Sequence, residues 1–151
     1  MSDNQFTAYE ARCAAVAALE AEHLPANKAS LFNALTAAGI AMVIVGFDGY
    51  GDSGQIESID VYGPDNTEAQ LPEATIAMAE VTFDGPRVVI EQRRPRDVIE
   101  GMAYAFLEQT HDGWENNDGA YGEFTFDVAA RSIALDYNER YTATNDYQHE
   151  F

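Results

Sequence analysis

The fold is decided by one stretch, His111-Asp-Gly-Trp-Glu-Asn-Asn-Asp-Gly-Ala-Tyr-Gly-Glu-Phe-Thr-Phe-Asp127, which holds the only tryptophan and a dense set of acids, amides and glycines. Apolar and polar residues alternate at its end over positions 123–128, and after a short turn the alternation returns over 133–137. Alternation with a period of two is typical of strands with one buried face. The stretch therefore predicts a loop that enters a β-hairpin, whose polar face carries carboxylates.

Between residue 40 and this hairpin the sequence predicts four strands and one helix. Residues 40–47 form a continuous apolar run, rich in β-branched side chains, which is typical of a central buried strand. Pro95 begins a helix with an apolar stripe at helical spacing, and this helix ends near His111. The other strands are expected at 55–62, 75–83 and 87–92.

The first 39 residues predict two helices. Apolar side chains recur at helical spacing up to about Glu22, and Leu24-Pro25 then breaks the pattern. A second helix is expected to end at Gly39, which suits a helix C-terminus. The two helices would form an α-hairpin.

The expected fold class is α+β, in one domain over residues 1–151. Its parts are a helical hairpin at 1–39, an α+β body at 40–140 and a polar tail at 141–151. Short turns join sequential strands, which favours a mostly antiparallel sheet of about six strands, packed on one face by helices.

Acidity is the strongest compositional signal. The chain has 26 acidic and 8 basic residues, for a formal net charge of −18, and four arginines fall within residues 87–96. Such a field disfavours nucleic acid and anionic membranes as direct ligands and favours basic surfaces or cations. A lone cysteine, Cys13, and the lack of a long apolar run favour the cytoplasm.

Clustered acids and amides also suit hard divalent cations. The spacing from Asp112 to Glu123 imitates an EF-hand loop, but Trp114 and Asn117 occupy positions that such a loop gives to a ligand and a glycine. The loops at 51–57 and 113–123 share their glycine and carboxylate character, and we expect them to meet. A metal-binding protein or metal-dependent enzyme is therefore an alternative, through the acidic loops at 48–57 and 112–123 and the carboxylates of Asp48, Asp52, Glu115, Asp118 and Glu123.

No motif supplies catalytic machinery. The segment Gly-Asp-Ser-Gly at 51–54 has no spacing to a histidine that marks a nucleophile with its base. The acids of the same loop would repel a phosphate group. We therefore expect no enzyme and no cofactor.

Three motifs resemble an uncharacterised family of small acidic bacterial proteins associated with plasmids, integrated elements and phages. They are Gly-Asp-Ser-Gly-Gln-Ile-Glu at 51–57, Gly-Trp-Glu-Asn-Asn-Asp-Gly-Ala-Tyr-Gly at 113–122 and Asp-Tyr-Asn-Glu-Arg at 136–140. The resemblance covers roughly residues 40–151. It implies a mobile-element setting, and it implies no activity or catalytic residue.

The leading prediction is a small interaction protein that presents a carboxylate surface to a basic, nucleic-acid-binding partner protein. Its sharpest form is a DNA mimic that inhibits host defence, as anti-CRISPR or anti-restriction proteins do. Eighteen negative charges correspond to roughly 30 Å of duplex DNA, and a domain of this length should be about 38 Å across. The charge density of the two is comparable if the acids share one side.

The expected partner-binding residues come from both loops and from the outward strand faces. They are Asp48, Asp52, Glu57, Trp114, Glu115, Asp118, Tyr121, Glu123, Asp127 and Asp136. Asp60 belongs to the same carboxylate array. Two further alternatives remain: a homodimer or homo-oligomer that docks through the basic strip at 87–96, and acidity that only confers solubility.

Overall fold

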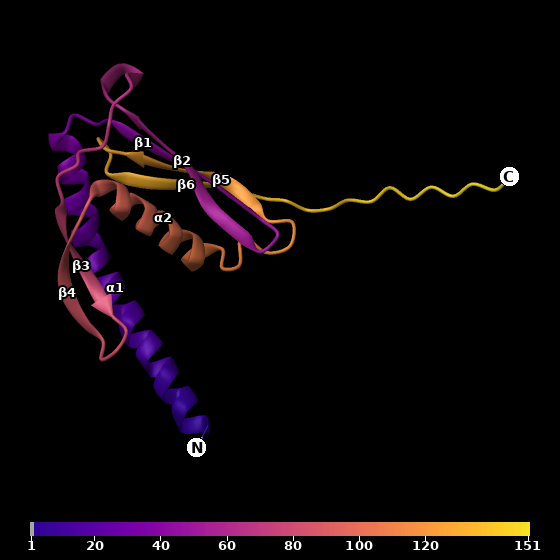
Figure 1. Cartoon of the computed structure of the whole chain (residues 1–151), viewed down its shortest axis with the longest axis horizontal. Coiled ribbons are helices and arrows are strands. Elements are labelled where there is room, and N and C mark those ends of the chain that lie inside the picture. The colour runs from indigo at the N-terminus through magenta and orange to yellow at the C-terminus, as the bar shows by residue number, and fades with distance from the viewer. Residues whose placement is uncertain (1) are drawn as a thin grey trace.

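The computed structural model describes the backbone of residues 2–151 and the side chains of residues 7–151. Two helices and six strands follow the chain in the order shown in Figure 1. They are α1 (Ser2–Ala37), β1 (Met42–Tyr50), β2 (Ser53–Tyr62), β3 (Ile76–Thr82), β4 (Arg87–Arg93), α2 (Pro95–Thr110), β5 (Ala120–Asp127) and β6 (Ser132–Glu139), with a short 3-10 turn at Pro64–Asn66. The expected α+β class with antiparallel strands is confirmed.

The main sheet has four antiparallel strands in the order β2-β1-β5-β6. The apolar run at 40–47 lies in a central strand, as expected, and alternate residues of β1 are buried. Both helices pack on the same face of this sheet and form one core with it. The most deeply buried side chains of that core are Leu31, Phe32 and Leu35 of α1, Ile99 and Leu107 of α2, and Val43, Val45, Phe124 and Phe126 of the sheet.

The expectation of one sheet of about six strands is wrong, because β3 and β4 form a separate two-stranded sheet. The end of β2 is already occupied by the loop that follows it: the N–H of Ala69 donates to the carbonyl of Val61 at 3.0 Å, and Glu68 forms an isolated bridge with Tyr62. The next strand therefore does not extend that edge. Instead the β3–β4 hairpin lies along α1 (Figure 1).

The expected N-terminal α-hairpin is also wrong, since α1 is one helix with Pro25 in its interior. Proline has no N–H, so the carbonyl of Ala21 loses its helical hydrogen bond. Both residues are exposed, and water can bond that carbonyl instead. Neither α1 nor α2, within the described residues, combines the length and the apolar content that a membrane crossing requires.

The β3–β4 hairpin supports the continuity of α1 through Pro25, because it contacts helix residues that come before the proline and residues that come after it. After the proline, the amide of Asn27 donates to the carbonyl of Ala79 and accepts from its N–H, both at 2.9 Å. Before the proline, the ring of Tyr9 packs 5.9 Å from that of Phe83, and the guanidinium of Arg12 lies over the same ring. Tertiary contacts therefore override the local helix-breaking signal.

We expect the substitution Asn27→Ala to lower the free energy of unfolding by about 1–3 kcal/mol, because it leaves two partly buried backbone groups of Ala79 without partners. Urea denaturation of both proteins measures the difference. Lys28→Ala, one residue along the same helix, should change the free energy of unfolding by less than about 0.5 kcal/mol. Equal losses in the two variants would contradict the bracing role of Asn27.

Candidate functional site

The four-stranded sheet has one face that no helix covers among the described residues. Strand residues alternate between the two faces, and the core face takes Val45 with its cross-strand neighbours. The opposite face therefore carries the residues one position away in each strand. We call it the outer face, and its carboxylates are Asp48, Asp60, Glu123, Asp127 and Asp136.

Two of these carboxylates stand directly opposite each other. Glu123 of β5 pairs in register with Asp136 of β6, and both side chains are exposed. Neither forms an ion pair with any residue in the described part of the chain. Like charges at directly opposed positions destabilise a sheet, so this pair does not serve the fold.

Arg140 is the basic side chain that contacts this face. Its guanidinium forms an ion pair with Asp48 at 2.9 Å, donates to the carbonyl of Gly49 at 3.0 Å and lies 4.7 Å from the centre of the Tyr121 ring. Its backbone N–H donates to Gly119 at 2.9 Å. Arg140 thus ties the end of β6 to the end of β1, and its charge is used within the chain.

The two glycine-rich loops, at 51–57 and 113–123, contact each other on the side of the sheet opposite the outer face. Their contact was expected. The N–H of Asp52 donates to the carbonyl of Glu115 at 3.0 Å. Trp114, only 7% exposed, packs against Gly49 and Gly54, where an added Cβ would lie 2.6 and 2.5 Å from the indole ring. Its ring also meets that of Phe47 edge-on, with centroids 5.5 Å apart. Trp114 is therefore a packing residue that joins the loops.

The structure divides the expected partner-binding residues into two groups. Those on the outer face are Asp48, Tyr121, Glu123, Asp127 and Asp136, together with Asp60. The others are Asp52 at the β1–β2 turn, Glu57 at a bulge of β2, Trp114, Glu115 and Asp118. Asp118 is half-buried and accepts a hydrogen bond from the hydroxyl of Thr142 at 2.7 Å.

The carboxylates considered for a divalent cation are not gathered in one place. Asp48 and Glu123 lie on the outer face, whereas Glu115 packs against Gly54 on the other side of the sheet. Within the described residues, no three histidine, cysteine, aspartate or glutamate side chains are close enough to hold a metal ion. The geometry gives no support to the metal alternative.

The basic strip is largely paired with acids of its own chain. Arg93 makes two hydrogen bonds to the carboxylate of Glu80, at 2.7 and 2.9 Å, and these bonds lower the pKa of Glu80 although its partial burial opposes the shift. Two further pairs, each with 3.6 Å between nitrogen and oxygen, are Arg94–Glu73 and Arg96–Glu100. Three of the four arginines of the strip therefore already have an acidic neighbour in their own chain.

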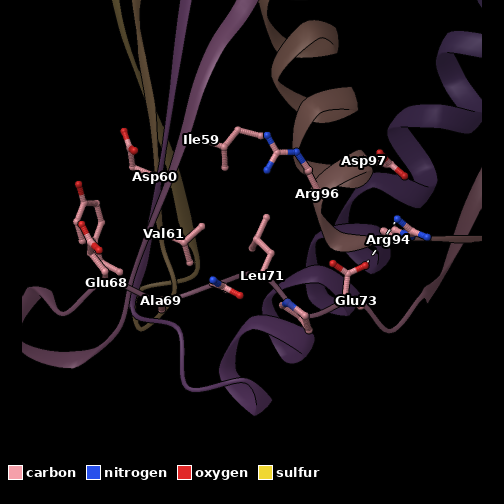
Figure 2. Close-up of a pocket in the computed structure, with 13 residues that line it drawn as sticks. Ile59, Asp60, Val61, Glu68, Ala69, Leu71, Glu73, Arg94, Arg96 and Asp97 are labelled. Carbon is pink, nitrogen blue, oxygen red and sulfur yellow. Dashed lines mark ion pairs between the residues drawn. The ribbon is translucent and has the colours of Figure 1, made fainter.

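A cavity of about 640 Å³ lies between the end of β2, the loop at 68–73 and the start of α2. Figure 2 shows its apolar floor of Ile59, Val61 and Leu71, with the Arg94–Glu73 ion pair at the rim. The other charged side chains that line it are Asp60, Glu68, Arg96 and Asp97. Both charge signs are present and partly paired, so this cavity favours no single class of ligand.

The model of a family of unknown function, DUF6878, matches residues 23–151, and the chain belongs to that family. This agrees with the uncharacterised family that the sequence motifs resemble. The match includes the sheet, both loops and the polar tail, and it leaves out the first 22 residues of the chain, of which residues 2–22 belong to α1. No curated protein matches the chain, and no solved structure does.

Proposed function

We propose that this member of a family of unknown function is an interaction protein, which presents its outer face to a basic, nucleic-acid-binding partner protein. The strongest support is that the face is uncovered and carries Asp48, Asp60, Glu123, Asp127 and Asp136, of which Asp48 alone has an ion-pair partner in the described residues. A basic surface would supply the missing counter-charges.

The opposed pair of Glu123 and Asp136 is a further observation that supports this role. Repulsion between the two carboxylates lowers the stability of the free protein, and lysine or arginine side chains of a partner would relieve it. The negative field of the whole chain would also speed the encounter with a basic surface, and this effect weakens as salt is added.

In its sharpest form the partner is a nucleic-acid-binding complex of host defence, inhibited as anti-CRISPR or anti-restriction proteins inhibit theirs, in the cytoplasm of a bacterium that carries a mobile element. A strand of eight residues is about 27 Å long, and that length of duplex DNA carries about 16 phosphates. The outer face carries five carboxylates. It is therefore a docking patch for part of a basic groove, and not a phosphate-by-phosphate copy of the duplex.

We expect the double substitution Glu123→Gln with Asp136→Asn to raise the free energy of unfolding by up to about 1 kcal/mol, because it removes the opposed charges. The same variant should lose the basic proteins that the unchanged chain retains from a nuclease-treated bacterial lysate at physiological salt. The measurements are urea denaturation and a pull-down with identification of the bound proteins.

A matched control removes the same charge elsewhere. Glu10→Gln with Glu22→Gln neutralises two exposed acids on the part of α1 that the family match leaves out. This control should retain the partner. The proposal would be contradicted if the unchanged chain, the outer-face variant and the control all recovered the same proteins. It would also be contradicted if the unchanged chain recovered none. Either result would leave solubility as the role of the acidic residues.

A further inference from the structure

The β3–β4 hairpin leaves one edge of its small sheet open. The outer edge of β3 faces α1, where the amide of Asn27 bonds both backbone groups of Ala79. Among the described residues β4 pairs with β3 alone, and Figure 1 shows β4 on the side of the hairpin away from α1. An open edge is a template for a further strand, so its chemistry decides what can pair with it.

The hydrogen bonds of Asn27 fix the direction of the backbone groups of β4. Because the N–H and C=O of Ala79 point to Asn27, the opposed pair Ala79 and Ile90 shares no hydrogen bond within the hairpin. The backbone groups of Ile90 therefore point away from β3, toward the open edge. Those of Val88 and Gln92 do the same, because the direction alternates along a strand.

The side chains of β4 combine apolar surface with charges of both signs. Ile90 is 64% exposed and shares one face of the hairpin with Val88. Arg87 and Glu91 are exposed on the other face, and neither forms an ion pair within residues 7–151. Charges on an edge usually discourage the approach of another strand. Here, however, the two charges are opposite in sign and can complement each other.

A second copy of β4 offers that complement in one register. Two β4 strands related by a two-fold axis run antiparallel, and their outward-pointing residues have to face each other, so the axis passes through a residue. With the axis at Val89, Arg87 of each copy stands opposite Glu91 of the other. Val88 then stands opposite Ile90 on the other face, and these two residues exchange both backbone hydrogen bonds.

The neighbouring registers lack this match. An axis at Ile90 would place Arg87 opposite Arg93, and an axis at Glu91 would place two glutamates opposite each other. An axis at Val88 would leave both Arg87 and Glu91 opposite uncharged residues. Since like charges at opposed positions destabilise a sheet and opposite charges stabilise it, the register centred on Val89 is favoured.

The two edges of the main sheet have no such complementarity. The edge strand β2 carries Glu57 and Asp60 and no basic residue, and the edge strand β6 carries Asp136 and Glu139 and no basic residue. Antiparallel pairing of either strand with its own copy would bring carboxylates together without a cation. Self-complementary charge is therefore confined to the β4 edge among the sheet edges that the structure describes.

We propose that two copies of this chain pair through β4 in the register centred on Val89, which joins their hairpins into one four-stranded sheet. The paired segment of five residues, 87–91, is about 17 Å long. This is a small contact beside the roughly 1,200–2,000 Å² that stable interfaces bury, so the dimer is weak and depends on protein concentration. The pairing does not rest on the proposed function, and each copy keeps its outer face uncovered.

The overall charge opposes association, since each copy carries a formal charge of −18. The region around β4 opposes it least, because residues 87–96 hold four arginines against one acid. At physiological salt the Debye length is about 8 Å, which screens the long-range repulsion and acts less on charges in direct contact. The dimer is therefore measured at that salt concentration.

The first experiment follows dimer formation by sedimentation velocity, up to a protein concentration of about 1 mM. Arg87→Glu and Glu91→Arg should each raise the dissociation constant at least about tenfold, because each places like charges opposite each other twice. The double variant with both substitutions restores opposite charges and should dimerise within about threefold of the unchanged chain. A chain that stays monomeric throughout, or a double variant as weak as the single ones, would overturn the proposal.

The two single variants also separate pairing from overall charge. Arg87→Glu makes the chain more negative and Glu91→Arg makes it less negative, so a mere change in repulsion would weaken one dimer and strengthen the other. Arg131→Glu is the matched control, since it makes the same charge change at an exposed turn between β5 and β6. Its dissociation constant should stay within about twofold of the unchanged chain's. A stronger dimer in Glu91→Arg would contradict the register.

Hydrogen exchange locates the contact. The amides of Val88 and Ile90 point to the open edge, so they should exchange more slowly as the protein concentration rises. The amides of Val89 and Glu91 are bonded to β3 within one copy and should change little. Protection elsewhere, with no change at Val88 and Ile90, would show that copies associate by another surface and would overturn the proposal.

The outer-face variant separates this inference from the proposed function. Glu123→Gln with Asp136→Asn should dimerise as the unchanged chain does, because both residues lie in the other sheet. Arg87→Glu should keep the melting temperature of the unchanged monomer, since its side chain is exposed and has no ion pair to lose within the described residues. Loss of the dimer in the outer-face variant would assign the interface to that face and contradict pairing through β4.

Discussion

Replacing Trp114 with alanine is expected to lower the free energy of unfolding by about 3–5 kcal/mol, the usual range for removal of a large buried aromatic side chain. Trp114 is 7% exposed, and its indole ring fills the space between Gly49, Gly54 and Phe47. The two glycines cannot move in to close the cavity, because both lie in paired strands. The loss should therefore approach the upper end of the range.

The same substitution should separate the two glycine-rich loops. The hydrogen bond from Asp52 to Glu115 lies beside the indole, so its amide should exchange faster with deuterium in the variant. Stability has to be followed by circular dichroism, since the variant has no tryptophan. Tyr50→Ala removes an aromatic ring that is 72% exposed at the end of the neighbouring strand and should change stability by less than about 0.5 kcal/mol. A loss in Trp114→Ala as small as this would contradict the packing role.

Gly119→Ala is expected to be comparably damaging, with a loss of about 3 kcal/mol or more. A non-glycine residue at a strained positive φ costs about 1–3 kcal/mol by itself, and Gly119 has φ +77°. In addition, a Cβ there would overlap the carbonyl of Gly49, so the ends of β1 and β5 would have to move apart. The hydrogen bond from Arg140 to Gly119 lies at the same place and would be disturbed.

Gly51 provides a matched control. It also has positive φ, at +60°, but nothing lies within 4 Å of a Cβ added there. Gly51→Ala should therefore lose only the conformational contribution, about 1–2 kcal/mol. Thermal or urea unfolding of both variants measures the difference. Equal losses would show that backbone conformation alone, and not the close approach to Gly49, requires glycine at position 119.

The elements that sequence periodicity predicts well are those whose neighbours in space are also neighbours in sequence. The hairpin of β5 and β6 and the helix α2 fall close to their expected positions, because each buries a stripe of its own residues. The long α1 could not be predicted in this way. Its continuity through Pro25 depends on contacts with β3 and β4, which follow about 50 residues later in the chain.

In the candidate site, too, the features set by local alternation were predictable and those set by contacts between distant segments were not. Alternation in β5 and β6 predicts that Glu123, Asp127 and Asp136 face away from the core, and the register confirms it. Alternation says nothing of which charges meet across the chain, so the pairing of Arg140 with Asp48 was not predictable from spacing. The stack of His111 on Tyr137 likewise joins a loop to a strand with no signal in either segment.

The uncovered face of the sheet also bears on how the family can diversify. Side chains on that face contribute little to holding the helices and strands together, since the core lies entirely on the opposite side. Substitutions there should therefore change the free energy of unfolding by no more than about 1 kcal/mol, whereas those at Trp114 or Gly119 should lower it by about 3 kcal/mol or more. A scaffold built in this way can exchange one set of surface charges for another and so change its binding specificity, while its architecture stays the same.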